Sequence, residues 1–345
     1  MWVEIAKNTF ESNDSRGFYF ILNLLTWNPG GSVSRYNVYV DSRDVDKTEN
    51  YRNLSIDDKK LLDEEFDAFI TSNGKVSYLI SEDNNSNTIF NLEEAIRFFI
   101  QPLSIILENN KNDASFIRAI IYHFDQTTAD GKQVLVDFMH NGWLQFENAG
   151  GCTNVENFIE GKLQSFNELA AKNNSDNHKY LRCIVILDSD TEFDGQPKKS
   201  QYLKLESYLH KKNITNYHFL EKRMMENYMP NEVVNSISDK STKAWIDVYN
   251  TLSDKQKDYL NYKSGFSKEK DEHGVRKPIK AEILALYPLD KTNFDHLDTG
   301  LNYANFKENF PSLFESSGLV NKFTLKNRAN SDELERILAK LKNLI

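Results

Sequence analysis

The feature that most constrains the fold is one apolar run that ends in alternating acids. Residues 181–187 are apolar apart from Arg182, and Asp188, Asp190 and Glu192 follow at alternate positions. A strand that is apolar on both faces is typical of a parallel sheet covered by helices, and ligands bind at the carboxyl ends of such strands. In an extended chain, residues two apart point to the same side. The sequence therefore predicts a buried strand that carries carboxylates to one edge of a sheet.

These carboxylates predict a metal site. Converging carboxylates repel one another unless a cation lies between them, and hard oxygen ligands suit Mg²⁺ or Mn²⁺. We therefore expect Asp188, Asp190 and Glu192 to be metal ligands. The alternative is an acidic surface loop that follows a core strand, and these residues alone leave both interpretations open.

Composition limits the class of protein. The chain has 345 residues, 39% of them hydrophobic, and a net charge of −9, which argues against binding nucleic acid through a wholly basic surface. A local basic groove and bound metal ions remain compatible with that charge. No apolar run approaches ~18 residues and the first residues lack a signal peptide pattern, so we expect a cytoplasmic protein without a membrane segment. The two cysteines, Cys152 and Cys183, are too few for a disulfide framework.

The first 90 residues are predicted to form a separate small α+β module. The expected elements are strands at 17–27 and 35–41 joined as a hairpin by a turn at 28–31, a helix at 55–70 and a strand at 75–80. The polar segment 81–88 marks the expected boundary. No residue pattern in this module points to chemistry.

A second strand also ends in an acid. After a helix at 91–100, residues 102–108 form an expected strand that ends at Glu108, and a helix over 114–124 follows with Asp113 at its start. Both acids are candidate metal ligands. In the alternative interpretation Asp113 is only a helix cap and Glu108 an exposed strand end.

Two further strands are expected in the same sheet. Residues 145–148 lead through Gly150 and Gly151 to a helix over 155–169, and glycines at such a turn let backbone N–H groups approach an anion. After a helix over 200–212, the last strand at 216–220 leads to a segment in which Arg223 and Glu226 share one helical face. These two residues either form a surface pair or bring a cation and an acid to the carboxylates.

The order of these elements, with Glu108 after the first strand, the Gly-Gly turn after the second and Asp188-Ser-Asp190 after the third, resembles a TOPRIM domain. The segment Arg223-x-x-Glu226-Asn-Tyr-Met-Pro230 makes it most similar to the OLD-family (overcoming lysogenisation defect) nucleases. The resemblance covers roughly residues 100 to 230. It implies a TOPRIM-like, mostly parallel sheet flanked by helices over residues 91–230, and metal binding during phosphodiester chemistry by Glu108, Asp188 and Asp190.

The chain departs from the family at two points. Asn109 stands where the first motif has glycine, and Asp113 comes one residue later than the family's aspartate. OLD proteins also carry an ABC-type ATPase, whereas this chain has no Gly-x-x-x-x-Gly-Lys-Ser/Thr motif. The resemblance thus implies a stand-alone nuclease, like the effectors of bacterial anti-phage defence systems, controlled by a separate ATPase subunit.

The region 231–345 is predicted to be mainly helical, with helices over 242–252, 254–262, 279–287 and 331–344. Between them, residues 263–280 hold the densest group of lysines. OLD enzymes use a late lysine, so Lys277 or Lys280 is a candidate to contact the scissile phosphate. The alternative is a solvated charged surface.

The predicted function is a Mg²⁺- or Mn²⁺-dependent endonuclease that acts on DNA or RNA with two metal ions. The sequence leaves both a monomer and a homodimer open. Asp188 and Asp190 would hold one ion, and Glu108, with Glu192 or Glu226, would help to hold the second. The alternative from another class is a non-catalytic TOPRIM-like subunit that binds and regulates an ATPase. If the nuclease interpretation is correct, the strands that end at Glu108 and Asp188 must lie side by side in one largely parallel sheet.

Overall fold

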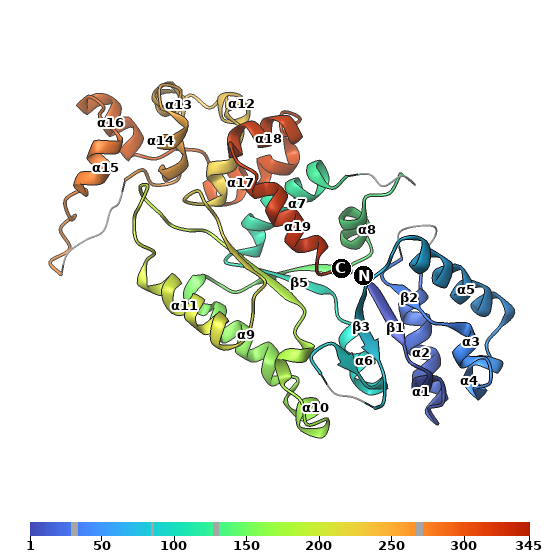
Figure 1. Cartoon of the computed structure of the whole chain (residues 1–345). Helices are drawn as coiled ribbons and strands as arrows, with labels where there is room; N and C mark the ends of the chain where they lie inside the picture. The colour runs from blue at the N-terminus through green and yellow to red at the C-terminus, as the bar shows by residue number, and fades with distance from the viewer. Residues whose placement is uncertain (29–33, 84–85, 127–130, 267–271) are drawn as a thin grey trace.

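The chain folds around two four-stranded sheets, and every strand pair in both sheets is parallel. The computed structural model describes residues 1–28, 34–83, 86–126, 131–266 and 272–345 (Figure 1). The first sheet has the order β2-β1-β3-β4 and consists of β1 (Trp2–Ile5), β2 (Asn37–Tyr39), β3 (Val76–Ile80) and β4 (Ile89–Phe90). The second has the order β6-β5-β7-β8 and consists of β5 (Leu103–Leu107), β6 (Leu144–Asn148), β7 (Cys183–Leu187) and β8 (Tyr217–Phe219). The general α/β prediction is confirmed.

The predicted N-terminal hairpin is wrong. The expected strand at 17–27 is instead the helix α2 (Ser15–Thr26), whose buried residues Phe18, Ile21, Leu22 and Leu25 recur at helical spacing. The Asp14 side chain accepts a hydrogen bond from the Gly17 N–H at 3.0 Å and caps the helix. The expected turn at 28–31 lies partly outside the described residues. Since β2 pairs in parallel with β1, the α+β module is an α/β unit.

The first sheet has its own core. The expected helix at 55–70 and strand at 75–80 are confirmed as α5 and β3. Helix α6, which follows the boundary expected at residue 90, contributes Leu92, Ala95, Phe98 and Phe99 to the core of the first sheet. The helices around this sheet, besides α2, are α1 (Lys7–Phe10), α3 (Ser42–Val45), α4 (Glu49–Arg52), α5 (Ile56–Thr71) and α6 (Leu92–Phe99).

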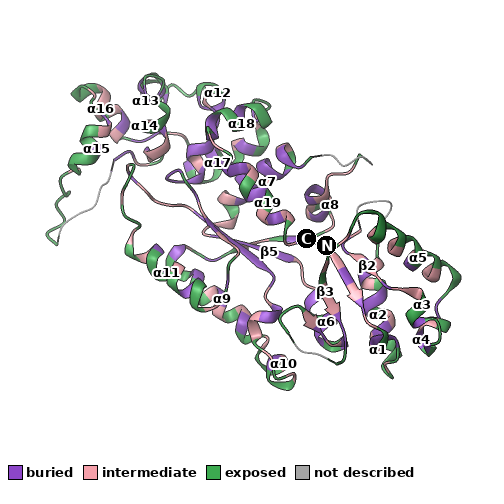
Figure 2. Ribbon diagram, in the orientation of Figure 1, coloured by how far each residue is buried: buried purple, intermediate pink, exposed green. Residues whose placement is uncertain are grey.

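The second sheet is covered on both faces. Ile184 and Ile186 of β7 belong to the core shared with the C-terminal helices, whereas Val185 and Leu187 belong to the core on the other face, beneath α9 and α11 (Figures 1 and 2). This alternation explains why β7 is apolar at every position. The expected helix at 155–169 is broken near Phe166 into α9 and α10. The helices of this part are α7 (Asn110–Phe124), α8 (Val134–His140), α9 (Val155–Gln164), α10 (Asn167–Lys172) and α11 (Ser200–Lys211).

The C-terminal region is helical, as predicted, and packs on α7. Its buried side chains form one continuous core with those of α7 and of one face of β5 and β7. Its helices are α12 (Asn231–Asn235), α13 (Lys243–Tyr249), α14 (Asp254–Tyr259), α15 (Ala281–Leu286), α16 (Lys291–Asp298), α17 (Phe306–Ser316), α18 (Lys322–Ala329) and α19 (Glu333–Lys342). Among the described residues, no helix has both the length and the apolar character needed to cross a membrane.

A buried arginine joins the two sheets. Arg182, directly before β7, donates to the Tyr36 hydroxyl beside the first sheet and to the carbonyl oxygens of Gln101 and Leu344 at 3.2 and 3.3 Å. The two chain ends lie close together beside this junction (Figure 1). The arginine that interrupts the apolar run before β7 is therefore a structural residue.

Candidate functional site

The strands that end in Glu108 and Asp188 are neighbours. β5 pairs with β7 in parallel, with Ile105 opposite Ile184 and Ile106 opposite Val185. Both strands run in the same direction, so the two acids leave the sheet at the same edge. In a sheet of this strand order, the first and third strands in sequence flank the point where ligands bind. The prediction that these strands lie side by side is confirmed.

The Gly-Gly turn holds Glu108 in place. The N–H groups of Gly150 and Gly151 donate to the Glu108 backbone oxygen at 3.1 and 3.0 Å. The Cys152 N–H lies 3.3 Å from the Glu108 side-chain oxygen Oε2. The expectation that the glycine amides lie free to approach an anion is therefore wrong, because the backbone of Glu108 already occupies them. Gly151 has φ 113°, a backbone conformation that residues other than glycine rarely adopt.

Asp188 and Asp190 are held by the segment that follows β8. The Met225 N–H donates to Asp188 Oδ1 at 3.0 Å, and the Asp190 N–H donates to the Arg223 carbonyl at 2.8 Å. Asp190 has φ 53°, in the left-handed region that aspartate tolerates better than most residues. The chain is therefore not extended at Asp190, although the alternation of acids predicted an extended segment there.

Tyr202 on α11 connects two of the acids. Its hydroxyl oxygen lies 3.0 Å from Asp190 Oδ2 and 3.5 Å from Glu108 Oε1. Burial and the negative charges of Glu108 and Asp190 raise the pKa of Tyr202 above its ordinary value, so the phenol keeps its proton and donates it. One hydroxyl therefore brings Glu108 and Asp190 within reach of each other.

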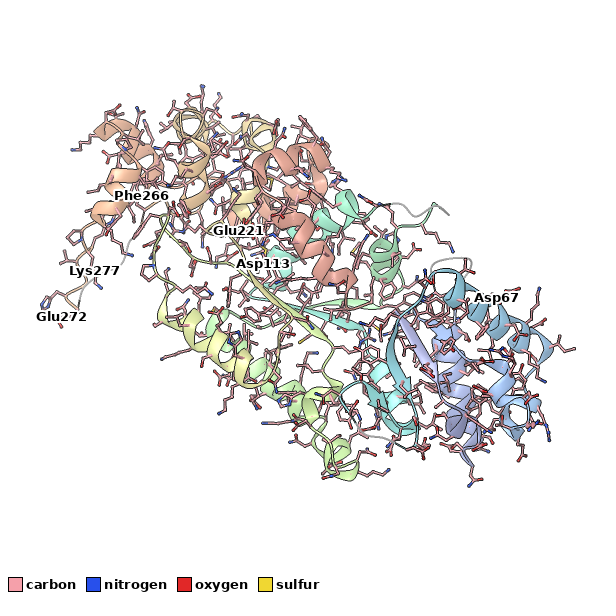
Figure 3. The ribbon with its side chains drawn as sticks, viewed as in Figure 1. Asp67, Asp113, Glu221, Phe266, Glu272 and Lys277 are labelled. Carbon is pink, nitrogen blue, oxygen red and sulfur yellow. The ribbon has the colours of Figure 1, made fainter. Side chains whose placement is uncertain are left out.

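Asp113 and Glu226 complete a cluster of five half-buried carboxylates. Asp113, labelled in Figure 3, lies at the start of α7 and accepts a hydrogen bond from the Asn109 N–H at 2.9 Å. Glu226 lies in the short 3-10 helix Met225–Tyr228. Its charge acts on both Asp113 and Asp188, so it approaches the cluster as the sequence predicted.

The five acids share unfavourable electrostatics. Burial, then the charge of Asp190, raises the pKa of Glu108 to about 7. Burial, then the charges of Glu226 and Glu108, raises the pKa of Asp113 to about 7. Burial raises the pKa of Asp188 well above its ordinary value, and all four other acids add to that rise. Burial also raises the pKa of Glu226. Such mutual repulsion of desolvated carboxylates is the condition that a cation relieves.

Glu192 does not join this cluster. Its buried carboxylate is paired with Lys280 and lies 3.7 Å from an Arg223 guanidinium nitrogen. Burial alone would raise the pKa of Glu192, but the hydrogen bond from Lys280 and the charges of Arg223 and Lys280 lower it. Two cations therefore neutralise this carboxylate, whereas burial and the other four acids are the strongest influences on the pKa of Asp188.

The candidate lysines have different places. Lys280 reaches the site indirectly, through its ion pair with Glu192. Lys277 lies far from Asp113, out on the extended segment before α15 (Figure 3). The sequence missed Lys199, whose ammonium lies 3.8 Å from Asp190, and Lys263 and Lys307, whose charges act on Glu226. Neither these lysines nor Tyr202 had a spacing signal, because they come from elements that only the tertiary fold brings together.

The donor set suits a hard divalent cation in its chemistry. Five carboxylates supply oxygen ligands only, as Mg²⁺ and Mn²⁺ prefer, and two of them have pKa values of about 7. In the part of the chain that the structure describes, no three or more His, Cys, Asp or Glu side chains are arranged so that they could already hold an ion. The carboxylates instead bond to backbone N–H groups and to Tyr202. Metal binding would therefore require these side chains to exchange some of those hydrogen bonds for the ion.

Comparisons with models of known protein families, with curated proteins and with solved structures found no significant match.

Proposed function

We propose that the chain is a metal-dependent nuclease that hydrolyses phosphodiester bonds in DNA or RNA at the edge formed by β5 and β7. The observation that supports the proposal is the cluster of five carboxylates around the carboxyl ends of the adjacent parallel strands β5 and β7, in which Asp188 is repelled by the other four. A protein that only needed a stable surface would leave such acids exposed and apart. The resemblance to the TOPRIM domains of OLD-family nucleases points to the same chemistry.

Glu108, Asp188 and Asp190 would hold Mg²⁺ or Mn²⁺, with Glu226 and Asp113 beside them. Such ions activate water and stabilise the leaving oxygen in phosphodiester hydrolysis. In that reaction the water oxygen bonds to phosphorus, the ester P–O bond breaks and the leaving oxygen gains a proton.

The rest of the site supplies charge and position. Lys199, whose side chain is 36% exposed, lies close enough to Asp190 to contact a phosphate bound there. Tyr202 keeps Glu108 and Asp190 oriented by hydrogen bonds to both. Arg223 is fixed by a hydrogen bond that its guanidinium donates to the Tyr259 carbonyl at 3.1 Å. Its positive charge acts on Asp190.

The test is cleavage of supercoiled plasmid and of a structured RNA by the purified chain with Mg²⁺ or Mn²⁺, and with EDTA. The proposal expects cleavage that needs the metal and that Asp188→Asn abolishes. The matched control is Asp83→Asn, at an exposed aspartate that follows β3 of the first sheet, which should leave cleavage unchanged. A chain that cleaves neither substrate with either metal would favour a non-catalytic role.

The proposal includes a separate ATPase subunit that controls the nuclease, as in bacterial anti-phage defence. It rests on the resemblance to stand-alone relatives of the OLD enzymes. Capture of the tagged chain from its native host, followed by mass spectrometry, should recover an ABC-type ATPase. Capture that recovers no ATPase, together with full and unregulated cleavage by the chain alone, would contradict this part of the proposal.

A further inference from the structure

A pocket of about 340 Å³ lies beside the acid cluster, along the outer edge of β8. The volume is at the lower end of the range of small-molecule sites, about 300 Å³ and above, so it suits one nucleoside-sized group. Ser189, which stands between Asp188 and Asp190, and Tyr202 both line it. Residues that line the pocket thus adjoin the acids directly.

Tyr202 belongs to both places. Its hydroxyl contacts Glu108 and Asp190, while its ring packs edge-on against Phe219, with 5.6 Å between ring centroids. Phe219 in turn packs against Tyr217, two residues earlier on the same face of β8, at 5.6 Å. One wall of the pocket is therefore aromatic, and its first ring, Tyr202, is the one that contacts the acids.

The two lysines that line the pocket already have partners. Lys198 pairs with both carboxylate oxygens of Glu206 at 2.8 Å and lies 5.0 Å from the centre of the Phe219 ring. Lys340 donates to the Tyr217 carbonyl at 2.6 Å. A pocket with aromatic walls, whose lysines are held by Glu206 and by the Tyr217 carbonyl, suits a flat, uncharged ring.

The edge strand also offers polar groups. The Tyr217 carbonyl points outward from the sheet, toward Lys340. In a parallel strand the backbone groups of alternate residues point the same way, so the peptide groups of Phe219 also face outward, into the pocket it lines. They provide one donor and one acceptor for the edge of a base.

We propose that this pocket holds an unpaired base of the substrate strand, next to the phosphate bound at the acids. The inference rests on the proposed function and names its substrate class, a single-stranded or locally opened nucleic acid. Stacking on an aromatic wall does not depend on the identity of the base, so the pocket selects for an unpaired base rather than for a sequence.

The experiment moves one abasic residue stepwise through a short single-stranded oligonucleotide, in DNA and in RNA form. With the wild-type chain and Mn²⁺, one position close to the cleaved bond should slow cleavage about tenfold when its base is missing. Tyr217→Ala should slow cleavage of the intact strand by a similar factor. On the strand that lacks that base, Tyr217→Ala should have little further effect, because the base and the ring contribute through the same contact.

Two variants separate the pocket from general damage. Phe219→Leu keeps apolar volume but removes the ring, so it should reproduce the loss seen with Tyr217→Ala. Tyr122→Ala removes an exposed tyrosine from α7, outside the pocket, and should leave cleavage unchanged. Independent, multiplicative effects of the missing base and of Tyr217→Ala would overturn the inference, as would the absence of any sensitive position.

The same oligonucleotides distinguish this inference from the proposed function. If the wild-type chain cleaves none of them, the proposed nuclease function fails. The affinity of the chain for the labelled strands, measured by fluorescence anisotropy, then tests the pocket on its own. Coupled losses of affinity for the missing base and Tyr217→Ala would retain the pocket as a base-binding site. Uncoupled losses, or no binding, would overturn it as well.

Discussion

The two sheets of this protein share one topology but differ at the edge where a ligand would bind. In each sheet the first strand in sequence lies inside, the second strand lies on one side of it, and the third and fourth lie on the other. In the first sheet, the segments that follow β1 and β3 are joined by a hydrogen bond from Asn8 Nδ2, in α1, to Ser81 Oγ at 3.0 Å. In the second sheet, the equivalent ends carry Glu108 and Asp188.

The difference shows that topology determines where strand ends meet, whereas residue type determines whether a ligand can bind there. The strand order places two strand ends together in both sheets. An amide and a hydroxyl satisfy each other and close the first edge as a neutral, internally bonded contact. Carboxylates cannot donate to one another when ionised, so the second edge stays electrostatically open to a cation. The fold therefore provides two equivalent positions, and the residues make only one of them a candidate site.

The largest expected effect contrasts the two edges directly. Glu108→Gln should lower metal-dependent cleavage by about 10³-fold or more, because it removes a carboxylate from the proposed metal site. The melting temperature should stay within a few degrees, since the neutral amide relieves repulsion. Asn8→Ala, at the counterpart edge, should leave the cleavage rate unchanged. Plasmid nicking rates and thermal unfolding curves measure both effects, and cleavage that survives Glu108→Gln would remove the assignment.

The second edge should also make stability depend on pH. In the folded protein the pKa values of Glu108 and Asp113 are about 7, against ordinary values of 4.5 and 3.8. The folded state therefore binds more protons than the unfolded state between about pH 4 and pH 7, so stability falls as the pH rises through this window. Without metal, the free energy of unfolding should fall by about 2–3 kcal/mol for each of these two groups between pH 5 and pH 8.

Chemical denaturation at several pH values tests this expectation. The double variant Glu108→Gln, Asp113→Asn should make the profile shallower, with Asp188 and Glu226 accounting for the dependence that remains, whereas Asp83→Asn should leave it unchanged. A wild-type profile that is flat, or that rises from pH 5 to pH 8, would show that the acids of the second edge do not repel one another in the folded protein.

Divalent cations should reverse the loss of stability at high pH. A ligand that binds only the folded state stabilises it in proportion to the logarithm of its concentration over its dissociation constant. Millimolar Mn²⁺ should raise the melting temperature by a few degrees at pH 8 and by less at pH 5, where protons compete for Glu108 and Asp113. Asp188→Asn should abolish the rise. An equal rise in Asp188→Asn would place the ion elsewhere.

The sequence predicted the second sheet better than the first. The apolar runs before Glu108 and Asp188 identified strands because both faces of these strands are buried. The run at 17–27 predicts a strand because most of its residues are apolar or aromatic, yet only one face of α2 is buried, at helical spacing. Strand β1, Trp2–Ile5, is too short to give a pattern, so the parallel topology of the first sheet was not predictable.

The site was predictable only as far as its residues follow strands. Glu108, Asp188, Asp190 and Glu226 lie at strand ends or in the segment after β8, Asp113 lies at the start of the helix that follows Glu108, and the structure brings all five together. Glu192 was expected among them, but Asp190 adopts a left-handed backbone conformation, and Glu192 pairs instead with Lys280. Tyr202 joins from α11, a contact that spacing along the chain cannot reveal.

A smaller effect is expected from Lys280, and it separates two roles. Lys280→Ala would leave the buried Glu192 carboxylate with Arg223 and the charge of Lys199 to compensate it. The loss should cost about 1–2 kcal/mol of stability, a modest value because the Lys280 side chain is 42% exposed and solvent screens its charge. Cleavage should fall only a few-fold, and Lys280→Arg should restore both properties. If Lys280 contacts the scissile phosphate itself, Lys280→Ala would instead lower cleavage by about 100-fold or more at unchanged stability.

The smallest effect belongs to the closed edge of the first sheet. Ser81 is buried, and its hydroxyl oxygen accepts hydrogen bonds from Asn8 Nδ2 at 3.0 Å and from the Asp83 N–H at 3.3 Å. Ser81→Ala removes the acceptor and leaves both donors to find water, which should cost about 1 kcal/mol of stability. Combining it with Asn8→Ala should cost less than the sum of the two single changes, because they break the same bond. Denaturant unfolding measures the coupling. Cleavage should stay at the wild-type rate throughout, and any loss of activity in Ser81→Ala would show that the first sheet's edge contributes to the site on the second.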